Sequence, residues 1–384
     1  MQGRPWRNRL KYLLLHSIGN LAPDNNEFVL KFLLFASYAY AYPVLRPLEA
    51  ELWRRGYECA WLLKPTCPDM LAPGEQRLAG YDEAIAYGPD AVLSPNIMVP
   101  DFLPGIKVMV FHGYPINKRS RKVDNHFRMR GWYDIFCTAG ESSTPTFRML
   151  EQKLGYFRVY ETGWPKADAY FAPAVRRLCE ERLRDTERVP TVLVASTFTR
   201  GITSMSEFLP EIERMASTRP WRWVITLHPK LRDPSVIEGC KRLAKEHENV
   251  VFKPVLDGVE DMARTDVMLC DSSSIIVEYR FLDKPVVTMR NATPGPHLLN
   301  VLSASDIEGA LERALTRPEP LMEAMRAYSL RQEAHRDGHN AARVIDAVED
   351  YQKRWQGRLP HKPLNLFRKL RLRWQLRRWY PIHF

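Results

Sequence analysis

Two histidines follow apolar, strand-like runs in the two halves of the chain. The run 107–111 ends at His112, and the run 223–227 ends at His228. Imidazole has an ordinary pKa of roughly 6.5, so it can accept a proton from a hydroxyl or donate a hydrogen bond to an anion near neutral pH. A single histidine is usually structural, but two at equivalent places favour a reaction in which one is the base and the other holds a phosphate.

Three serines after another apolar run form a candidate anion site. Ser272, Ser273 and Ser274 come directly after Asp271 and open a helical pattern. Unpaired backbone N–H groups and the helix dipole both favour a negative charge at such a helix start. Ordinary N-capping needs only one serine. The repetition therefore favours phosphate binding.

Cations are crowded just beyond the first histidine. Gly113 is expected to let the backbone turn closely after His112, and Lys118, Arg119 and Arg121 follow within a few residues. Such a group could steer an anionic substrate toward the imidazole. For each cation the alternative is an ordinary solvated loop.

All these residues share one position relative to the expected secondary structure, the end of a strand. Short runs rich in Val, Ile and Leu alternate with longer helical patterns, which is typical of parallel sheets with helices on both faces. Ligands of such sheets bind outside the carboxyl ends of the strands. The strands are expected within 31–42, 58–65, 90–96, 106–113, 134–140 and 157–165, and then within 191–197, 222–229, 250–255, 266–274 and 284–289.

Two such units meet near residues 170–190, at a charged helical stretch. The fold class is therefore α/β, with two doubly wound domains that face each other across a ligand-binding cleft. The expected divisions are a first domain over 1–175, a second over 176–325, C-terminal helices over 326–357 and a basic, aromatic tail over 358–384.

The net charge of +11 belongs to the end of the chain. Ten of the 56 basic residues lie between 351 and 384, where there is no Asp or Glu, which leaves 46 basic against 45 acidic residues elsewhere. A protein that binds nucleic acid through its folded surface carries a basic face on that surface. The nearly neutral body argues against this class.

Within the tail, Leu364, Phe367, Leu370 and Trp374 recur at helical spacing among the cations. A basic amphipathic helix of this kind suits an anionic membrane surface. It could instead bind RNA, or pack on its own protein.

Other classes of site and segment lack a signal. The six cysteines have irregular spacing, without a CxxC pair or a zinc-ligand set, so reduced, buried thiols and no bound metal are expected. The start of the chain lacks the pattern of a signal peptide, and no run approaches the roughly 18 apolar residues of a membrane-spanning helix.

Five motifs in order resemble the CDP-glycerol glycerophosphotransferases, the teichoic-acid primase and polymerase class. They are HGYPINK, GWPKAD, STFTRG, TLHP and CDSSSIIVEYRFLDKPVV, spread over residues 105–290. The chain differs from the usual family forms at Lys166 and Thr226, where the family has Arg, and at Ser272, where it has Tyr. The resemblance implies the GT-B fold, two Rossmann-like domains, with the acceptor on the first and the nucleotide donor on the second.

The resemblance implies transfer of a glycerol phosphate unit. An acceptor hydroxyl attacks the β-phosphorus of CDP-glycerol and CMP leaves, a reaction that depends on positioning and charge stabilisation. The acceptor would be lipid-linked or a polysaccharide in cell-envelope polymer synthesis, such as teichoic acid or capsule, in bacteria, and no cofactor is implied. The alternative is a GT-B glycosyltransferase that uses a nucleotide sugar.

Site roles follow from the same resemblance. His112 would be the base, with Gly113, Lys118, Arg119 and Arg121 toward the acceptor, and His228 would hold the pyrophosphate. Glu278 could accept from a ribose or glycerol hydroxyl, or only face solvent or pack. Asp168 could orient a neighbour or cap the next helix, and capping is the favoured role. The donor-binding set is Lys166, Thr197, Arg200, Asp271, Ser272, Ser273, Ser274 and Glu278.

Lipid-linked acceptors, together with the neutral body, favour the membrane interpretation of the tail over RNA binding. We therefore expect a cytoplasmic protein held on the inner face of the plasma membrane through residues 358–384, with no nucleic-acid partner.

Overall fold

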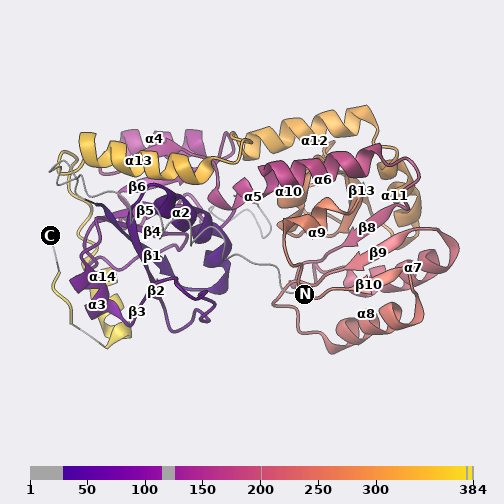
Figure 1. The fold of residues 1–384 in the computed structure, drawn as a ribbon, viewed down its shortest axis with the longest axis horizontal. Helices are drawn as coiled ribbons and strands as arrows, with labels where there is room; N and C mark the ends of the chain where they lie inside the picture. Colours follow the sequence, from indigo (N-terminus) through magenta and orange to yellow (C-terminus); the bar gives the residue numbers. More distant parts are fainter. Residues whose placement is uncertain (1–28, 115–125, 200, 378, 383–384) are drawn as a thin grey trace, which may run out of the picture.

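A computed structural model describes residues 29–114, 126–199, 201–377 and 379–382. It contains two sheets, of seven and six strands, and every described pair of neighbouring strands is parallel. Helices cover both faces of each sheet (Figure 1), so two doubly wound domains are present as expected from the apolar runs.

The first sheet has the order β3-β2-β1-β4-β5-β6-β7. Its central strands are buried along nearly their whole length, which explains why they form continuous apolar runs. The strands are β1 (Lys31–Ala36), β2 (Glu58–Leu63), β3 (Arg77–Leu78), β4 (Ala91–Ser94), β5 (Ile106–Met109), β6 (Ile135–Thr138) and β7 (Arg158–Glu161), and the helices are α2 (Tyr42–Arg54), α3 (Tyr81–Tyr87) and α4 (Thr144–Leu154).

The first strand is shorter than predicted. It ends at Ala36 instead of residue 42, and the chain then forms a 3-10 turn, η1 (Ala39–Ala41), and enters α2. Pro43 is the physical reason, because it lacks the N–H that a sheet ladder needs but suits the first turn of a helix. The turn brings Tyr40 to the carboxyl end of the sheet.

The second sheet has the order β10-β9-β8-β11-β12-β13. The strands are β8 (Thr191–Val194), β9 (Arg222–Ile225), β10 (Val250–Phe252), β11 (Val267–Cys270), β12 (Val286–Met289) and β13 (Leu299–Val301). The helices are α6 (Pro173–Arg184), α7 (Met205–Thr218), α8 (Pro234–Glu246), α9 (Val259–Ala263), α10 (Ile275–Arg280), α11 (Ile307–Leu315) and α12 (Glu319–Gln332).

The chain crosses between the domains twice. The first crossing runs through η2 (Pro165–Ala167) and α5 (Asp168–Phe171) into α6, and the second runs from α12 into α13 (Asn340–Arg354). Figure 1 shows α12 over the second domain and α13 over the first. The apolar core continues across the boundary, where the ring of Phe281 lies 5.6 Å from that of Phe171.

The C-terminal helix, α14 (Leu366–Leu376), packs on the first domain. Arg373 is fully buried and donates to both carboxylate oxygens of Asp101, at 3.0 and 3.1 Å. Beyond the helix, the ring of Tyr380 stacks on that of Phe102 at 4.1 Å. One face of the tail is therefore held by its own protein, as one of the three alternatives for this segment required.

Candidate active site at the domain boundary

The His112 turn follows β5 and has a defined proton arrangement. Nδ1 of His112 lies 3.3 Å from the carbonyl oxygen of Pro95. A carbonyl oxygen can only accept a hydrogen bond, so Nδ1 carries the proton and Nε2 of the neutral ring keeps its lone pair. This is the tautomer that a general base requires.

The surroundings keep this imidazole neutral. Burial by nearby protein atoms lowers the pKa of His112, and the hydrogen bond to Pro95 only partly opposes that effect. The ring is nevertheless exposed to solvent. Because the residue is exposed, a substrate hydroxyl can reach it.

A polar chain fixes the wall beside His112. The ring of Tyr40 lies 4.9 Å from the imidazole, and its hydroxyl donates to Oδ1 of Asn96 at 3.2 Å. The Asn96 amide in turn donates to the Phe35 carbonyl at 3.0 Å, at the end of β1. Burial raises the pKa of Tyr40 to about 12, so the phenol stays protonated and continues to donate.

His228 has the opposite tautomer. Its Nδ1 accepts a hydrogen bond from the backbone N–H of Lys230 at 3.1 Å. The proton of the neutral ring is therefore on Nε2, which can donate to an anionic oxygen. The ring of Phe198, in the loop after β8, lies 4.3 Å from the imidazole and orients it.

Asp271 holds the loops at the carboxyl end of the second sheet. It is fully buried, and its carboxylate accepts from the Ser196 hydroxyl at 2.6 Å and from the backbone N–H groups of Thr197, Ser204 and Ser272 at 2.9, 3.2 and 2.6 Å. The family resemblance implies a donor-binding role for Asp271. Because these contacts occupy the carboxylate inside the protein, its inferred role is to position the two loops.

The serine turn lies between β11 and α10. Ser272 and Ser273 are buried and Ser274 is exposed. The Ser272 hydroxyl accepts from the N–H of Ala292 at 2.8 Å, which ties the turn to the loop after β12. The helix that follows has only six residues, so its dipole is short and the local N–H groups matter more than the helix as a whole.

Two predicted donor-binding residues pair with each other across the boundary. Nζ of Lys166, in η2, lies 2.6 Å from Oε2 of Glu278, in α10. The Tyr170 hydroxyl donates to the same oxygen at 2.5 Å. Both contacts use Oε2, and they join the first crossing to the helix that carries the serine turn.

The GWPKAD motif also holds the second crossing. The Asp168 carboxylate accepts from the N–H groups of Asn340 and Ala341, both at 2.8 Å, and so caps the start of α13. The sequence predicts that it caps the next helix, but the first residue of the helix it caps, Asn340, lies 172 residues later in the chain. Burial raises the pKa of Asp168 to about 6.

Some expected residues lie elsewhere or outside the described chain. Lys118, Arg119, Arg121 and Arg200 fall outside the described residues. The left-handed residue of this turn is Phe111, with φ of 49°, and a Cβ on Gly113 would meet nothing within 4 Å.

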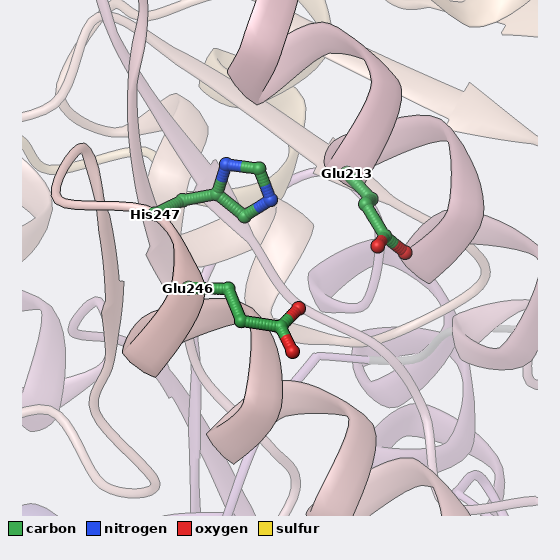
Figure 2. A group of neighbouring side chains, drawn as sticks. All are labelled: Glu213, Glu246 and His247. Carbon is green, nitrogen blue, oxygen red and sulfur yellow. The ribbon is translucent and has the colours of Figure 1, made fainter.

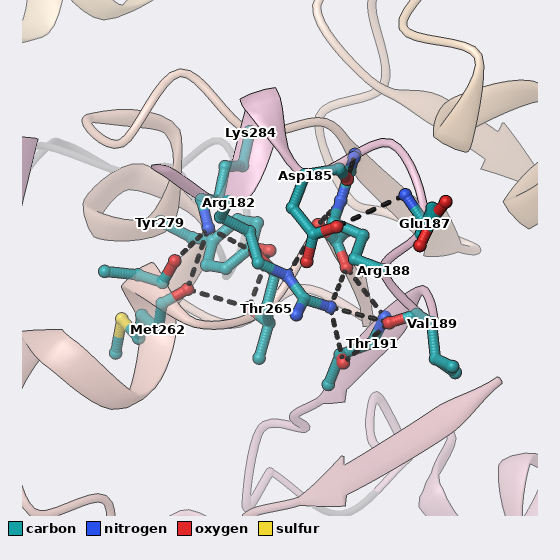
Figure 3. A network of polar contacts seen from close by, with 12 residues as sticks. Arg182, Asp185, Glu187, Arg188, Val189, Thr191, Met262, Thr265, Tyr279 and Lys284 are labelled. Carbon is teal, nitrogen blue, oxygen red and sulfur yellow. Dashed lines mark hydrogen bonds and ion pairs between the residues drawn. The ribbon is translucent and has the colours of Figure 1, made fainter. Parts of the chain in front are cut away.

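The lysine of the DKP motif is structural. Lys284 is buried and donates to the carbonyl groups of Met262, Ala263 and Thr265, at the end of α9 (Figure 3). Desolvation lowers its pKa to about 8. It therefore holds in place the chain segment that leads into β11, at the end of the strand opposite the serine turn.

Within the described part of the chain, one group of side chains has the spacing of a cation site. Figure 2 shows Glu213, Glu246 and His247, whose ligand atoms lie within 4.8 Å of one another. The Arg242 guanidinium bridges the two carboxylates, at 2.8 and 2.6 Å, and so already offsets part of their charge. They lie on α7 and at the end of α8, away from the carboxyl ends of the strands, so the group is not part of the candidate active site.

Comparisons with known proteins agree with the motifs. Residues 108–294 match the family model described as CDP-glycerol:poly(glycerophosphate) glycerophosphotransferase. This confirms the resemblance and supports an enzyme of the glycerophosphotransferase type. No curated protein sequence matches the chain.

Solved structures confirm the GT-B-type fold. A putative UDP-N-acetylglucosamine 2-epimerase from Listeria monocytogenes has a TM-score of 0.56 at 16% identity, over 84% of this chain and 97% of its own. The wall teichoic acid polymerase TagF has 0.56 at 14% identity, over 84% and 89%. The UDP-GlcNAc 2-epimerase from Neisseria meningitidis, bound to UDP-GlcNAc, has 0.52 at 15% identity, over 83% and 99%.

Proposed function

We propose that this chain, whose residues 108–294 match the CDP-glycerol glycerophosphotransferase family, transfers glycerol phosphate from CDP-glycerol to a hydroxyl of a lipid-linked or polysaccharide acceptor and releases CMP. The product would be a cell-envelope polymer of the teichoic-acid kind. The family match carries the proposal, because the matched region contains the turns of His112 and His228 and the serine turn together.

The chemical step assigns the proton to His112. The acceptor oxygen forms a bond to the β-phosphorus, the bond from that phosphorus to the oxygen of CMP breaks, and CMP leaves with the electron pair. The hydroxyl proton passes to Nε2 of His112, the ring atom that its contact with Pro95 leaves unprotonated. A lowered pKa keeps this atom ready at neutral pH.

The donor would lie against the second domain. Nε2–H of His228, the hydroxyl of Ser272 and the N–H groups of Ser273 and Ser274 would hold the pyrophosphate, because the Ser272 N–H already donates to Asp271. Thr197 and Arg200, which follow β8 in the sequence, would be further phosphate partners. Glu278 uses Oε2 for its contacts with Lys166 and Tyr170, so Oε1 is the atom proposed to accept from a ribose or glycerol hydroxyl.

The tail would hold the enzyme on the anionic inner face of a membrane. The surface of α14 opposite Arg373 exposes Phe367 and Trp374, at 90% and 73%, and Trp379 is 75% exposed beyond the helix. Aromatic side chains among cations suit a lipid interface. No helix among the described residues is both long and apolar enough to cross a membrane.

A donor panel tests the function. Purified protein is incubated with an acceptor lipid and CDP-glycerol, or with UDP- and GDP-sugars, and the nucleotide product is identified. The expected result is CMP from CDP-glycerol only when the acceptor is present. Turnover of a nucleotide sugar, with none of CDP-glycerol, would replace the proposal with a glycosyltransferase.

A further inference from the structure

Glu333 is a buried carboxylate in the second crossing, directly after α12. It is 0% exposed, although a carboxylate is costly to bury without partners. Its hydrogen bonds are all to neutral groups, at the side chains of Tyr114 and Asn340 and the backbone of Trp164 and His335. Neither the motifs nor the family match includes this residue.

The two short hydrogen bonds point to the His112 turn. Oε2 of Glu333 accepts from the Tyr114 hydroxyl at 2.5 Å and from the Trp164 backbone N–H at 3.0 Å. The contacts to Oε1, from the Asn340 amide and the His335 N–H, are both 3.4 Å and therefore weaker. One oxygen thus joins two segments of the first domain.

Those two segments hold the chain just before and just after His112. Tyr114 comes two residues after His112. The Trp164 indole N–H donates to the carbonyl of Phe111, the residue before His112, at 3.3 Å. The rings of Tyr114 and Trp164 also meet edge to face at 5.1 Å.

The turn needs such support. Phe111 has φ of 49°, a left-handed conformation that costs roughly 1–2 kcal/mol for a residue with a side chain. Strained backbone persists where its surroundings hold it in place. Gly163 allows the close approach, because a Cβ there would lie 2.6 Å from Oε1 of Glu333.

We propose that Glu333 is a positioning residue, which sets the orientation of the His112 ring through Tyr114 and Trp164. The catalytic part of this inference rests on the proposed function; the structural part does not. It links the base in the first domain to the crossing from α12, so that the second domain's last helix and the base are mechanically connected.

Three substitutions separate positioning from general stabilisation. Glu333→Leu keeps the bulk but removes the acceptor, whereas Glu333→Gln keeps one acceptor oxygen for the two short bonds. Asp168→Ala is the matched control, because it also removes a carboxylate, here half-buried, that holds the second crossing but accepts from neither Tyr114 nor Trp164. Tyr114→Phe removes a single hydroxyl and serves if Glu333→Leu does not fold.

The first measurement needs no substrate. In protein with 13C-labelled histidine, the His112 signal is assigned with His112→Gln and titrated. Glu333→Leu or Tyr114→Phe should shift the His112 signal and its titration midpoint, and Glu333→Gln and Asp168→Ala should leave both near wild type. An unchanged His112 signal in Glu333→Leu and Tyr114→Phe would overturn the proposal.

The second measurement is turnover of CDP-glycerol. Glu333→Leu should lower kcat at least tenfold with a KM for the donor within about twofold of wild type, and Glu333→Gln should restore most of kcat. If Asp168→Ala lowers kcat as much as Glu333→Leu at equal loss of thermal stability, Glu333 is only structural. A wild-type enzyme inactive on CDP-glycerol would defeat the proposed function but leave the titration result valid.

Discussion

His112 and His228 are fixed in opposite tautomers, each by one backbone hydrogen bond. The Pro95 carbonyl accepts from Nδ1 of His112, and the Lys230 N–H donates to Nδ1 of His228. The two Nε2 atoms therefore differ: the first has a lone pair and the second has a proton. Although both histidines follow a strand, His112 can therefore act as a base and His228 as a hydrogen-bond donor.

The first prediction is that glutamine distinguishes the two roles. A glutamine amide can reach the position of Nε2 and donate a hydrogen bond, but it cannot act as a base. His112→Gln should lower kcat by about 10²–10⁴, the usual contribution of general base catalysis. His228→Gln should retain at least a tenth of kcat, and His228→Ala should lose more. Steady-state rates of CMP release measure both.

Thermal unfolding is the control for these variants. Because His112 is exposed, His112→Gln should melt within about 2 °C of wild type. Equal loss of kcat in His112→Gln and His228→Gln would contradict the assignment of separate roles.

The second prediction concerns the pH dependence of the reaction. Burial lowers the pKa of His112, and the base must be unprotonated, so kcat/KM should fall on the acid side with a midpoint below the ordinary value of roughly 6.5. Initial rates between pH 4.5 and 8, corrected for enzyme stability, give the midpoint. A midpoint above 7 would exclude a desolvated His112 as the base.

The positions of the strand-end residues could be predicted from the sequence, because buried parallel strands are continuous apolar runs and ligands meet their carboxyl ends. His112, His228 and Ser272 follow β5, β9 and β11 in this way. Their tautomers and pairings could not be predicted, because these depend on groups far away in the chain. The partner of Lys166 lies 112 residues later, in Glu278.

Tyr40 and Glu333 do not follow a strand, and no sequence pattern indicated a role for them in the site. Tyr40 lies in an apolar run that resembled a continued strand, and only the early start of α2 brings it beside His112. Glu333 follows an ordinary helical pattern, and its contacts with Tyr114 and Trp164 arise only when the second crossing folds back. Such contacts are properties of the tertiary structure, which local sequence patterns do not encode.

The third prediction uses His297 to test stability. Burial, followed by the charges of Arg280 and Arg331, lowers its pKa to about 4. In the unfolded chain His297 binds a proton below roughly pH 6.5, whereas in the folded protein it binds one only below about pH 4. The free energy of unfolding therefore falls as the pH drops from roughly 6.5 to about 4. Between pH 7 and pH 5 this histidine should remove about 2 kcal/mol.

Urea unfolding at the two pH values measures this effect. The loss of stability between pH 7 and pH 5 should be smaller in His297→Gln by about that amount, and unchanged in His339→Gln, a replacement at an exposed histidine. The ring of His297 stacks on Tyr328 at 3.8 Å, so the variant is also expected to be less stable at pH 7. An identical pH dependence in both variants would refute the assignment.

The fourth prediction separates the two faces of α14. Arg373→Ala leaves Asp101 without its buried partner, a change that costs roughly 3–5 kcal/mol. Because the arginine also donates to the carbonyl groups of Tyr380 and Lys369, its loss should release the whole segment after residue 360 from the first domain. Limited trypsin digestion, followed by mass spectrometry, should show faster cleavage in this segment.

Substitutions on the opposite face of α14 should weaken lipid binding without loosening the packing of the helix on the first domain. Phe367→Ser with Trp374→Ser removes aromatic surface that is mostly exposed, so protease resistance should match wild type while flotation with vesicles that contain anionic phosphatidylglycerol falls at least fivefold. Leu366→Ser is a matched control, since this residue is exposed on the same helix but less so, at 43%. If the double variant still floats with the vesicles, the membrane contact lies elsewhere. If the wild type binds RNA at physiological salt and the double variant binds it more weakly, the nucleic-acid alternative is favoured.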